Sequence, residues 1–273
     1  RRPHLPPRLQ ERLRRARLHS LGQKKVTERL DKVLSHAGFG TRKDAKKILR
    51  KGLVSVNGQV VRDFDFKLDL EADQLFVDGQ RVGVQSDLYL MMNKPADYVC
   101  ANKDGLHQTV FSLLEDGYRT PYFESRLHLV GRLDIDTQGL LLFTTDGDLT
   151  HRLISPKTSC PKKYFVRLEK PFGQEERAAV EEKLAQGIMV PEEDHEAAFK
   201  ALPAKIEWTE AADEVFLTVT EGKYHQVKRM FLALENKVAG LKRVQIGGLA
   251  LDPSLEPGEY RKLTAEELAA LEK

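Results

Sequence analysis

The spacing of apolar residues predicts two short helices and a hairpin in the first third of the chain. In "TERLDKVLSHAGFG" apolar side chains recur at helical spacing between a cap at Thr27 and a stop at Gly38, and "TRKDAKKILRKG" begins a second helix at Thr41. The alternating segments "LVSV" and "QVV" flank an Asn-Gly pair, which favours a tight hairpin turn. These elements predict a compact unit that ends near Val84.

The rest of the chain mixes strands and helices without a regular alternation. The segments "LYLMMNKP", "HLV", "GLLLFTT", "KYFVRLE", "AKIEWT" and "EVFLTVT" read as strands, and helical patterns cover 148–154, 174–186, 225–235 and 264–272. The polar run "TTDGD" predicts a turn whose Asp148 caps the next helix. Because the strands are joined by loops as often as by helices, we expect an α+β fold around a mixed, mostly antiparallel sheet, preceded by a small N-terminal α/β unit.

Composition limits the kind of protein without identifying it. A chain of 273 residues that is 41% apolar is long enough for one large and one small domain. Its apolar runs are of strand length, which predicts a soluble protein with no membrane partner. Cys100 and Cys160 have no spacing typical of a zinc site, so we expect passive thiols, no metal, and a reducing cytoplasm as the location.

The positive charge is concentrated at the N-terminal end. Residues 1–51 carry 17 Lys or Arg against 4 Asp or Glu, a net charge of +13, while the remaining 222 residues carry 27 against 37, a net charge of −10. Residues 1–25 combine dense arginine with three prolines among the first seven residues, which predicts a flexible basic tail. Such clustering favours a polyanionic partner, most simply a nucleic acid.

The segment "RLDKVLSHAGFGTRKDAKKILRKGLVSVNGQVV" resembles the αL-type RNA-binding domain of small-subunit ribosomal protein four. The resemblance implies that residues 26–84 bind structured RNA and that the second helix presents its basic face to that RNA. The residues expected to make these contacts are Arg42, Lys43, Lys46, Lys47 and Arg50.

The stretch "GRLDIDTQGLLLFTT" admits two chemical interpretations. A D-x-D-x-T run is typical of phosphatases resembling haloacid dehalogenases, in which an aspartate attacks phosphate beside a magnesium ion. However, Gly131 and Arg132 interrupt the apolar run before Asp134, and the acidic segment "PEEDHE" at 191–196 reads as a surface loop. The phosphatase interpretation is therefore disfavoured.

Five ordered motifs support the other interpretation. "NKPADYVC", "HLVGRLDIDTQGLLLFTTDG", "HRLISPKTSCPKKYFV", "GKYHQVKRMF" and "LKRVQIGGLAL" resemble the ribosomal-RNA pseudouridine synthases of the RsuA type. The resemblance implies that residues 85–273 form a catalytic domain that converts uridine to pseudouridine without a cofactor. It also implies that Asp134 is the essential residue and that Asp136 organises the loop. Tyr164 is expected to pack against the target base and to help in its deprotonation, and Lys228 to pair with Asp134 more loosely than an arginine would.

The chemistry itself favours a carboxylate in this position. The reaction breaks a carbon–nitrogen bond, rotates the uracil and rejoins it through carbon five, and a carboxylate can bond to or stabilise the electron-poor carbon, or can take a proton from the ribose. The base must also leave its stack, so a stacking platform is needed. Arg132 is expected to fill the vacated space or hold a phosphate, and Lys94, Arg229 and Arg243 to contact RNA phosphates. His128, His151 and His225 are interpreted as packing or RNA-contact residues rather than bases.

The identity of the RNA is less sharply indicated than the reaction. The motifs "HRLISPKTSCPKKY" and "GKYHQVKRMF" favour the 16S branch, although the 23S branch shares most of its motifs. A non-catalytic ribosome-assembly factor is a further alternative, against which the intact Asp134, Tyr164 and Lys228 argue. We expect a monomer whose partner is ribosomal RNA or a partly assembled subunit.

Overall fold

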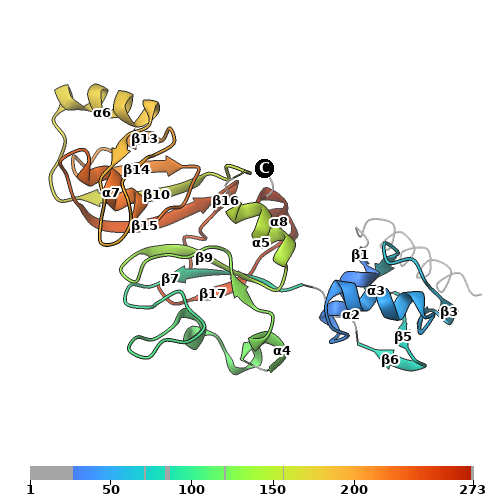
Figure 1. Ribbon diagram of the computed structural model, residues 1–273. Helices are drawn as coiled ribbons and strands as arrows, with labels where there is room; N and C mark the ends of the chain where they lie inside the picture. Colours follow the sequence, from blue (N-terminus) through green and yellow to red (C-terminus); the bar gives the residue numbers. More distant parts are fainter. Residues whose placement is uncertain (1–26, 71, 84–86, 120, 156, 272–273) are drawn as a thin grey trace, which may run out of the picture. The chain divides into compact units, whose positions relative to one another are not determined.

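The computed structural model describes residues 27–70, 72–83, 87–119, 121–155 and 157–271. The chain divides between residues 86 and 87 into two compact units (Figure 1); the sequence placed the boundary after Val84. The predicted basic tail, 1–25, lies outside the described residues. None of the described helices is long and apolar enough to cross a membrane.

The first unit contains two helices and two small sheets. Its helices are α2 (Leu30–His36) and α3 (Arg42–Arg50). Strands β1 (Thr27–Arg29) and β4 (Lys67–Asp69) form one antiparallel pair, and the second sheet has the order β3 (Gln59–Val60), β2 (Val54–Val56), β5 (Leu75–Val77), β6 (Gln80–Val82). Fully buried leucines from both helices and from β4 fill the core between them.

Local sequence signals account for most of this unit. Thr41 caps α3 in a capping box, in which the Asp44 amide donates to its hydroxyl and the Asp44 carboxylate accepts from its backbone amide. Asn57 and Gly58 have φ values of 50° and 82°, the left-handed conformation that the predicted hairpin turn requires. The predicted cap at Thr27 is wrong, because pairing with β4 draws that residue into β1 and helix α2 begins only at Leu30.

The second unit is built around one large sheet. The strands of this unit are β7 (Tyr89–Lys94), β8 (His128–Leu129), β9 (Gln138–Thr144), β10 (Lys162–Leu168), β11 (Met189–Val190), β12 (Phe199–Lys200), β13 (Lys205–Trp208), β14 (Glu214–Val219), β15 (Val238–Ile246), β16 (Leu249–Ala250) and β17 (Tyr260–Lys262). Strands β11 and β12 form a separate antiparallel pair outside the large sheet. The helices of this unit are α4 (Pro121–Glu124), α5 (Gly147–Ile154), α6 (Gln174–Gln186), α7 (Gln226–Leu232) and α8 (Ala265–Ala270), with 3₁₀ turns at Val110–Leu113 and Asp116–Tyr118.

The large sheet is mixed and mostly antiparallel, which confirms the predicted fold class. Its strand order is β13-β14-β10-β15-β9-β7-β17, with β16 paired to β15 and β8 paired to β9. Among the described strands, β9 and β15 form its parallel pair, and the other pairs are antiparallel. This parallel pairing joins the two halves of the sheet, and it brings the loop before β9 near β15 and β10.

Two details of this unit differ from the sequence prediction. Asp146, not Asp148, caps α5, because the Asp146 carboxylate accepts hydrogen bonds from the amides of Asp148 and Leu149 at 3.0 and 3.1 Å. Strand β15 was not predicted as a strand, because its charged sequence "LKRVQI" hides the apolar alternation. Its central position in the sheet is set by pairing with β10 and β9, which are distant along the chain.

Candidate active site

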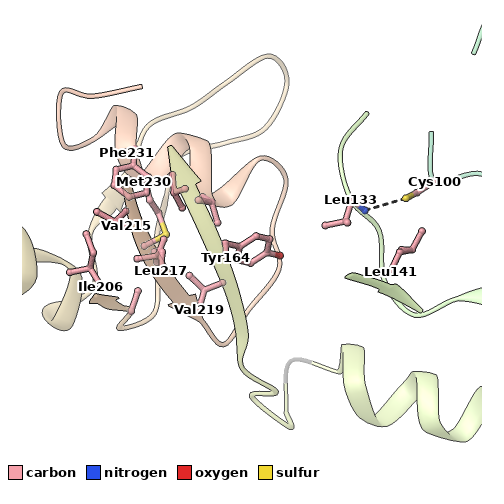
Figure 2. Packing of buried hydrophobic residues seen from close by; sticks show 14 of the residues in the cluster. Cys100, Leu133, Leu141, Tyr164, Ile206, Val215, Leu217, Val219, Met230 and Phe231 are labelled. Atoms are coloured by element: carbon pink, nitrogen blue, oxygen red, sulfur yellow. Dashed lines mark hydrogen bonds between the residues drawn. The ribbon is translucent and has the colours of Figure 1, made fainter. Parts of the chain in front are cut away.

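Hydrogen bonds to its backbone groups fix the loop between Val130 and β9. The Thr137 amide donates to the Asp134 carbonyl at 3.1 Å, and the Lys94 ammonium donates to the carbonyls of Ile135 and Thr137 at 3.1 and 2.8 Å. The Leu133 amide contacts Cys100 Sγ at 3.4 Å (Figure 2). This tight loop leaves the Asp134 carboxylate partly accessible, with 30% of its side chain exposed.

Lys228 holds both aspartates of the loop from α7. Its Nζ lies 2.7 and 2.9 Å from the two carboxylate oxygens of Asp136 and 3.1 Å from Oδ2 of Asp134. The sequence predicted a loose pair with Asp134, but the structure shows a shared ammonium whose shorter contacts go to Asp136. Asp136 thereby fixes the cation that faces Asp134.

This contact keeps Lys228 protonated and Asp136 ionised. Burial alone would lower the pKa of Lys228, but the hydrogen bond with Asp136 and the charge of Asp134 outweigh burial and raise that pKa above its usual value. Burial alone would raise the pKa of Asp136, but Lys228 outweighs it and holds the pKa below its ordinary value. At neutral pH Lys228 is therefore a cation and Asp136 an anion.

Tyr164 lies on β10, in the wall of a pocket that Asp134 also lines. The residue is opposite Arg243 of β15 in the antiparallel register, so the two side chains share one face of the sheet. Figure 2 shows its ring projecting from β10, with Val219, Leu217 and Met230 on one side and Leu133 on the other. Buried apolar packing fixes the ring, as a stacking platform requires.

Asp134 and Tyr164 both line one pocket of about 260 Å³. Loop 131–137, strands β10 and β15, and the segment that leads into α7 supply its walls. The charged and polar side chains that line it include Arg132, Asp134, Lys162, Tyr164, His225 and Arg243. The pocket thus joins a partly exposed carboxylate, an aromatic ring and several cations.

Lys162 and His225 also line this pocket; the sequence did not select Lys162, and it favoured a packing or RNA-contact role for His225. Lys162 lies two residues before Tyr164 on β10, and this spacing places both on one face of the strand. Its Nζ donates to the Cys160 carbonyl at 3.0 Å, and burial lowers its pKa from the ordinary value. The motif "KKY" already contained the spacing that identifies Lys162.

Two predicted phosphate contacts need correction. Lys94 has no exposed surface and donates to the carbonyls of Pro95, Ile135 and Thr137, so its ammonium is already satisfied. Arg229 is 1% exposed and donates to four backbone carbonyls. Arg243 is 2% exposed and donates to the Leu140 carbonyl, but it also lines the pocket and its Nη2 has no hydrogen-bond partner among the described residues. The predicted contacts of Arg243 and of the exposed Arg132 therefore stay predictions.

The basic residues of α3 remain accessible to different degrees. Lys43, Lys47 and Arg50 are exposed, and Arg42 and Lys46 are half-buried. Lys47 contacts Asp44 at 2.9 Å, and the Lys46 ammonium lies over the Phe64 ring. Lys43 and Arg50 are therefore the α3 cations best placed for an external anion.

The described residues contain no group of three or more His, Cys, Asp and Glu side chains arranged to hold a metal ion. Both cysteines are buried and unpaired. Burial raises the pKa of the Cys100 thiol, which keeps it protonated at neutral pH.

Comparison with known proteins agrees with this fold. The RNA pseudouridylate synthase family model matches residues 88–233, more than half of the chain, and the S4 domain model matches residues 28–75. "Ribosomal small subunit pseudouridine synthase A" of Vibrio parahaemolyticus is 48% identical over 88% of this chain and 97% of its own length. The protein of the same name from Escherichia coli K12 is 41% identical over 89% of this chain and 99% of its own length. A crystal structure described as a pseudouridylate synthase is 39% identical, covers 89% of this chain and 99% of its own, and has a TM-score of 0.60.

The chain belongs to the RNA pseudouridylate synthase family and carries an S4 domain at its N-terminal side. It is therefore an isomerase that acts on RNA.

Proposed function

We propose that this protein isomerises one uridine of small-subunit ribosomal RNA to pseudouridine. The observation that carries the proposal is the Asp134 carboxylate, held 3.1 Å from Lys228 in the pocket that Tyr164 lines. The names of the relatives from Vibrio parahaemolyticus and Escherichia coli support the small ribosomal subunit as the source of the RNA.

In the proposed mechanism Asp134 faces the anomeric carbon of a flipped-out uridine. As the bond from this carbon to nitrogen one breaks, its positive charge is met by the carboxylate, either through a covalent bond or through electrostatic stabilisation. Tyr164 packs against the detached uracil while it turns to present carbon five. Lys228 keeps Asp134 in place, and no electron is gained or lost, so the reaction requires no redox cofactor.

RNA capture is assigned to the first unit and to the rim of the pocket. Lys43 and Arg50 of α3 contact phosphates, and Arg132 contacts the backbone beside the flipped nucleotide. The working form proposed here is a monomer. The proposed substrate is ribosomal RNA, naked or in a partly assembled subunit, and the proposed location is the cytoplasm.

The test uses small-subunit and large-subunit RNA transcripts that carry tritium at carbon five of uridine, with a chelator present. Pseudouridine formation exchanges that hydrogen with water, so the parent should release a stoichiometric amount of tritium from the small-subunit transcript or subunit particle, and the Asp134→Asn variant should release none. Release from the large-subunit transcript instead would reassign the substrate. No release from either RNA would overturn the proposed activity and favour the assembly-factor alternative.

A further inference from the structure

Arg243 differs from the buried cations Lys94 and Arg229 in its hydrogen bonding. The ammonium of Lys94 donates to three backbone carbonyls, and the guanidinium of Arg229 donates to four. Arg243 is 2% exposed, and its Nε donates to the Leu140 carbonyl at 2.9 Å, but its Nη2 has no hydrogen-bond partner among the described residues. One donor of this guanidinium is therefore left for a group that the chain itself does not supply.

The charge of Arg243 is unpaired as well. The nearby carboxylates of Asp134 and Asp136 contact Lys228 and His225, and within the described part of the chain no ion pair involves Arg243. A guanidinium stays protonated at neutral pH, and an unpaired buried charge lowers the stability of a fold. A buried polar group that breaks this rule is typical of a functional site.

Thr137 presents a second unpartnered group in the same pocket. Thr137 is 1% exposed, and its Oγ1 has no hydrogen-bond partner among the described residues. Both Thr137 and Arg243 line the pocket that contains Asp134. A hydroxyl can donate and accept, whereas a guanidinium can only donate. The two groups together suit a ligand that carries carbonyl oxygens and an N–H group, as the polar edge of uracil does.

The neighbouring strands fix the position of Arg243. The residue pairs with Tyr164 of β10 on one side and with Gly139 of β9 on the other, and its Nε is held by the Leu140 carbonyl. The absence of a side chain at Gly139 allows β9 to approach the Arg243 backbone closely. The guanidinium is therefore held in place before a ligand enters, as electrostatic stabilisation of a transition state requires.

We propose that Nη2 of Arg243 donates a hydrogen bond to a carbonyl oxygen of the target uracil. This inference rests on the pseudouridine synthase function proposed above. When the bond from the anomeric carbon to nitrogen one breaks, its electron pair stays on the uracil, and the oxygens on carbon two and carbon four share the negative charge. Arg243 stabilises this charge until carbon five bonds to the anomeric carbon, and it neither forms a covalent bond nor gives up a proton. The Thr137 hydroxyl contacts the same polar edge of the ring.

Burial favours the base over an RNA phosphate as the partner of Arg243. Phosphates of the RNA backbone remain outside the pocket, within reach of the exposed Arg132, whereas a flipped-out base enters the pocket and reaches its walls. Tyr164, which the proposed mechanism places against the uracil, lies opposite Arg243 in the strand register. Arg243 thus contacts the base instead of the phosphate that the sequence suggested.

The first test separates binding from chemistry. Arg243→Gln removes the charge, while its amide can still donate to the Leu140 carbonyl. We expect the single-turnover rate at saturating RNA to fall by about 100-fold or more, with RNA affinity and its salt dependence unchanged. The matched control is Lys242→Gln, the same charge change at the neighbouring position of β15, and it should react at the parental rate because Lys242 is not among the described residues that line the pocket.

The melting temperature distinguishes a ligand-binding role from a structural one. Because Arg243→Gln removes an unpaired buried charge, we expect its melting temperature to equal or exceed that of the parent. Arg229→Gln breaks several bonds to backbone carbonyls, so its melting temperature should fall.

The second test changes the uracil instead of the protein. After the modified uridine has been mapped, the RNA is ligated with a single 2-thiouridine or 4-thiouridine at that position, since sulfur accepts hydrogen bonds more weakly than oxygen. We expect one of the two substitutions to slow the parent and Lys242→Gln by about 10-fold or more, and to have little further effect in Arg243→Gln, where the contact is already lost. Arg243→Lys keeps a cation without the fork of donors and should lose the same sensitivity, which preserves the comparison if Arg243→Gln does not fold.

The outcomes separate this inference from the proposed function. Equal parental rates on the unmodified RNA and on both thiouridine RNAs would overturn the inference, and so would a sulfur effect as large in the Arg243 variants as in the parent. Weaker RNA affinity and a shallower salt dependence in Arg243→Gln would return Arg243 to phosphate binding, and a lower melting temperature with undiminished sulfur sensitivity would make its role structural. An inactive parent on unmodified RNA would instead contradict the pseudouridine synthase function itself.

Discussion

At the scale of single residues, buried cations organise the pocket from behind. Lys94, Arg229 and Arg243 each donate to backbone carbonyls, and none of them faces solvent. The motifs in the sequence were enough to select Asp134, Tyr164 and Lys228 as candidates; the structure brings Asp134 and Tyr164 to one pocket and places Lys228 against Asp134. The motifs were not enough to distinguish buried cations from RNA contacts, because the backbone carbonyls that accept from these cations belong to other segments of the chain. The catalytic roles of the three selected residues stay predictions until variants are measured.

Lys94 offers a direct test of this distinction. Lys94→Met leaves buried carbonyl groups without a donor, so we expect the free energy of unfolding to fall by about 3 kcal/mol. Urea denaturation measures this change, and the exposed Lys103→Met provides the control with little expected effect. Unchanged stability together with weaker RNA binding would restore Lys94 as a phosphate contact.

At the scale of elements, the close approach of β9 to β15 determines the position of the aspartate loop. Gly139 has φ +102°, and a Cβ there would lie 2.2 Å from the Arg243 carbonyl oxygen. Periodicity predicted β9 and the full extent of α6, since both have local signals. It missed β15 and the start of α2, because pairing with distant strands decides both.

The Gly139 contact predicts a strong and local response to a small change. Gly139→Ala forces β9 away from β15, so we expect a loss of about 3 kcal/mol in unfolding free energy and a large loss of activity. Gly147→Ala, whose added Cβ meets nothing within 4 Å, is the matched control and should stay within about 0.5 kcal/mol of the parent. Equal stability of the two variants in thermal or urea unfolding would contradict the close-approach argument.

Helix α3 provides an independent test of RNA binding. The double variant Lys43→Ala/Arg50→Ala removes two exposed cations, so we expect weaker affinity and a plot of log K against log salt that is shallower by about 1.5. Filter binding at several salt concentrations measures the slope, and kcat at saturating RNA should be unchanged. A parental slope would mean that this face of α3 does not contact phosphates.

At the scale of the whole molecule, ion pairs between neighbouring segments of residues 252–267 make stability depend on pH. Arg261 of β17 contacts Asp252 at 2.7 Å and Glu267 of α8 at 2.6 Å. Hydrogen bonds from Ser254 and from Arg261 lower the pKa of Asp252 from 3.8 to about 2. Because the folded value lies below the ordinary one, this carboxylate stabilises the fold above pH 3.8 and loses that effect as the pH falls towards 2.

The Asp252→Asn variant should therefore differ from the parent mainly at neutral pH. We expect its melting temperature to be lower than that of the parent at pH 7, and the difference to narrow as the pH falls through the range from 3.8 to about 2. Thermal unfolding followed by circular dichroism across this range measures both curves. A difference that widens in acid would contradict the assigned direction of the pKa shift.

The central claim is that Asp134 performs the chemistry and that Asp136 fixes Lys228 beside it. The most direct measurement is the single-turnover rate of pseudouridine formation in small-subunit RNA for the parent, Asp134→Asn and Asp136→Asn. We predict that Asp134→Asn lowers the rate by about 10,000-fold with RNA affinity retained, and that Asp136→Asn lowers it by about 10-fold. Near-parental turnover by Asp134→Asn, or a larger loss in Asp136→Asn, would contradict the account.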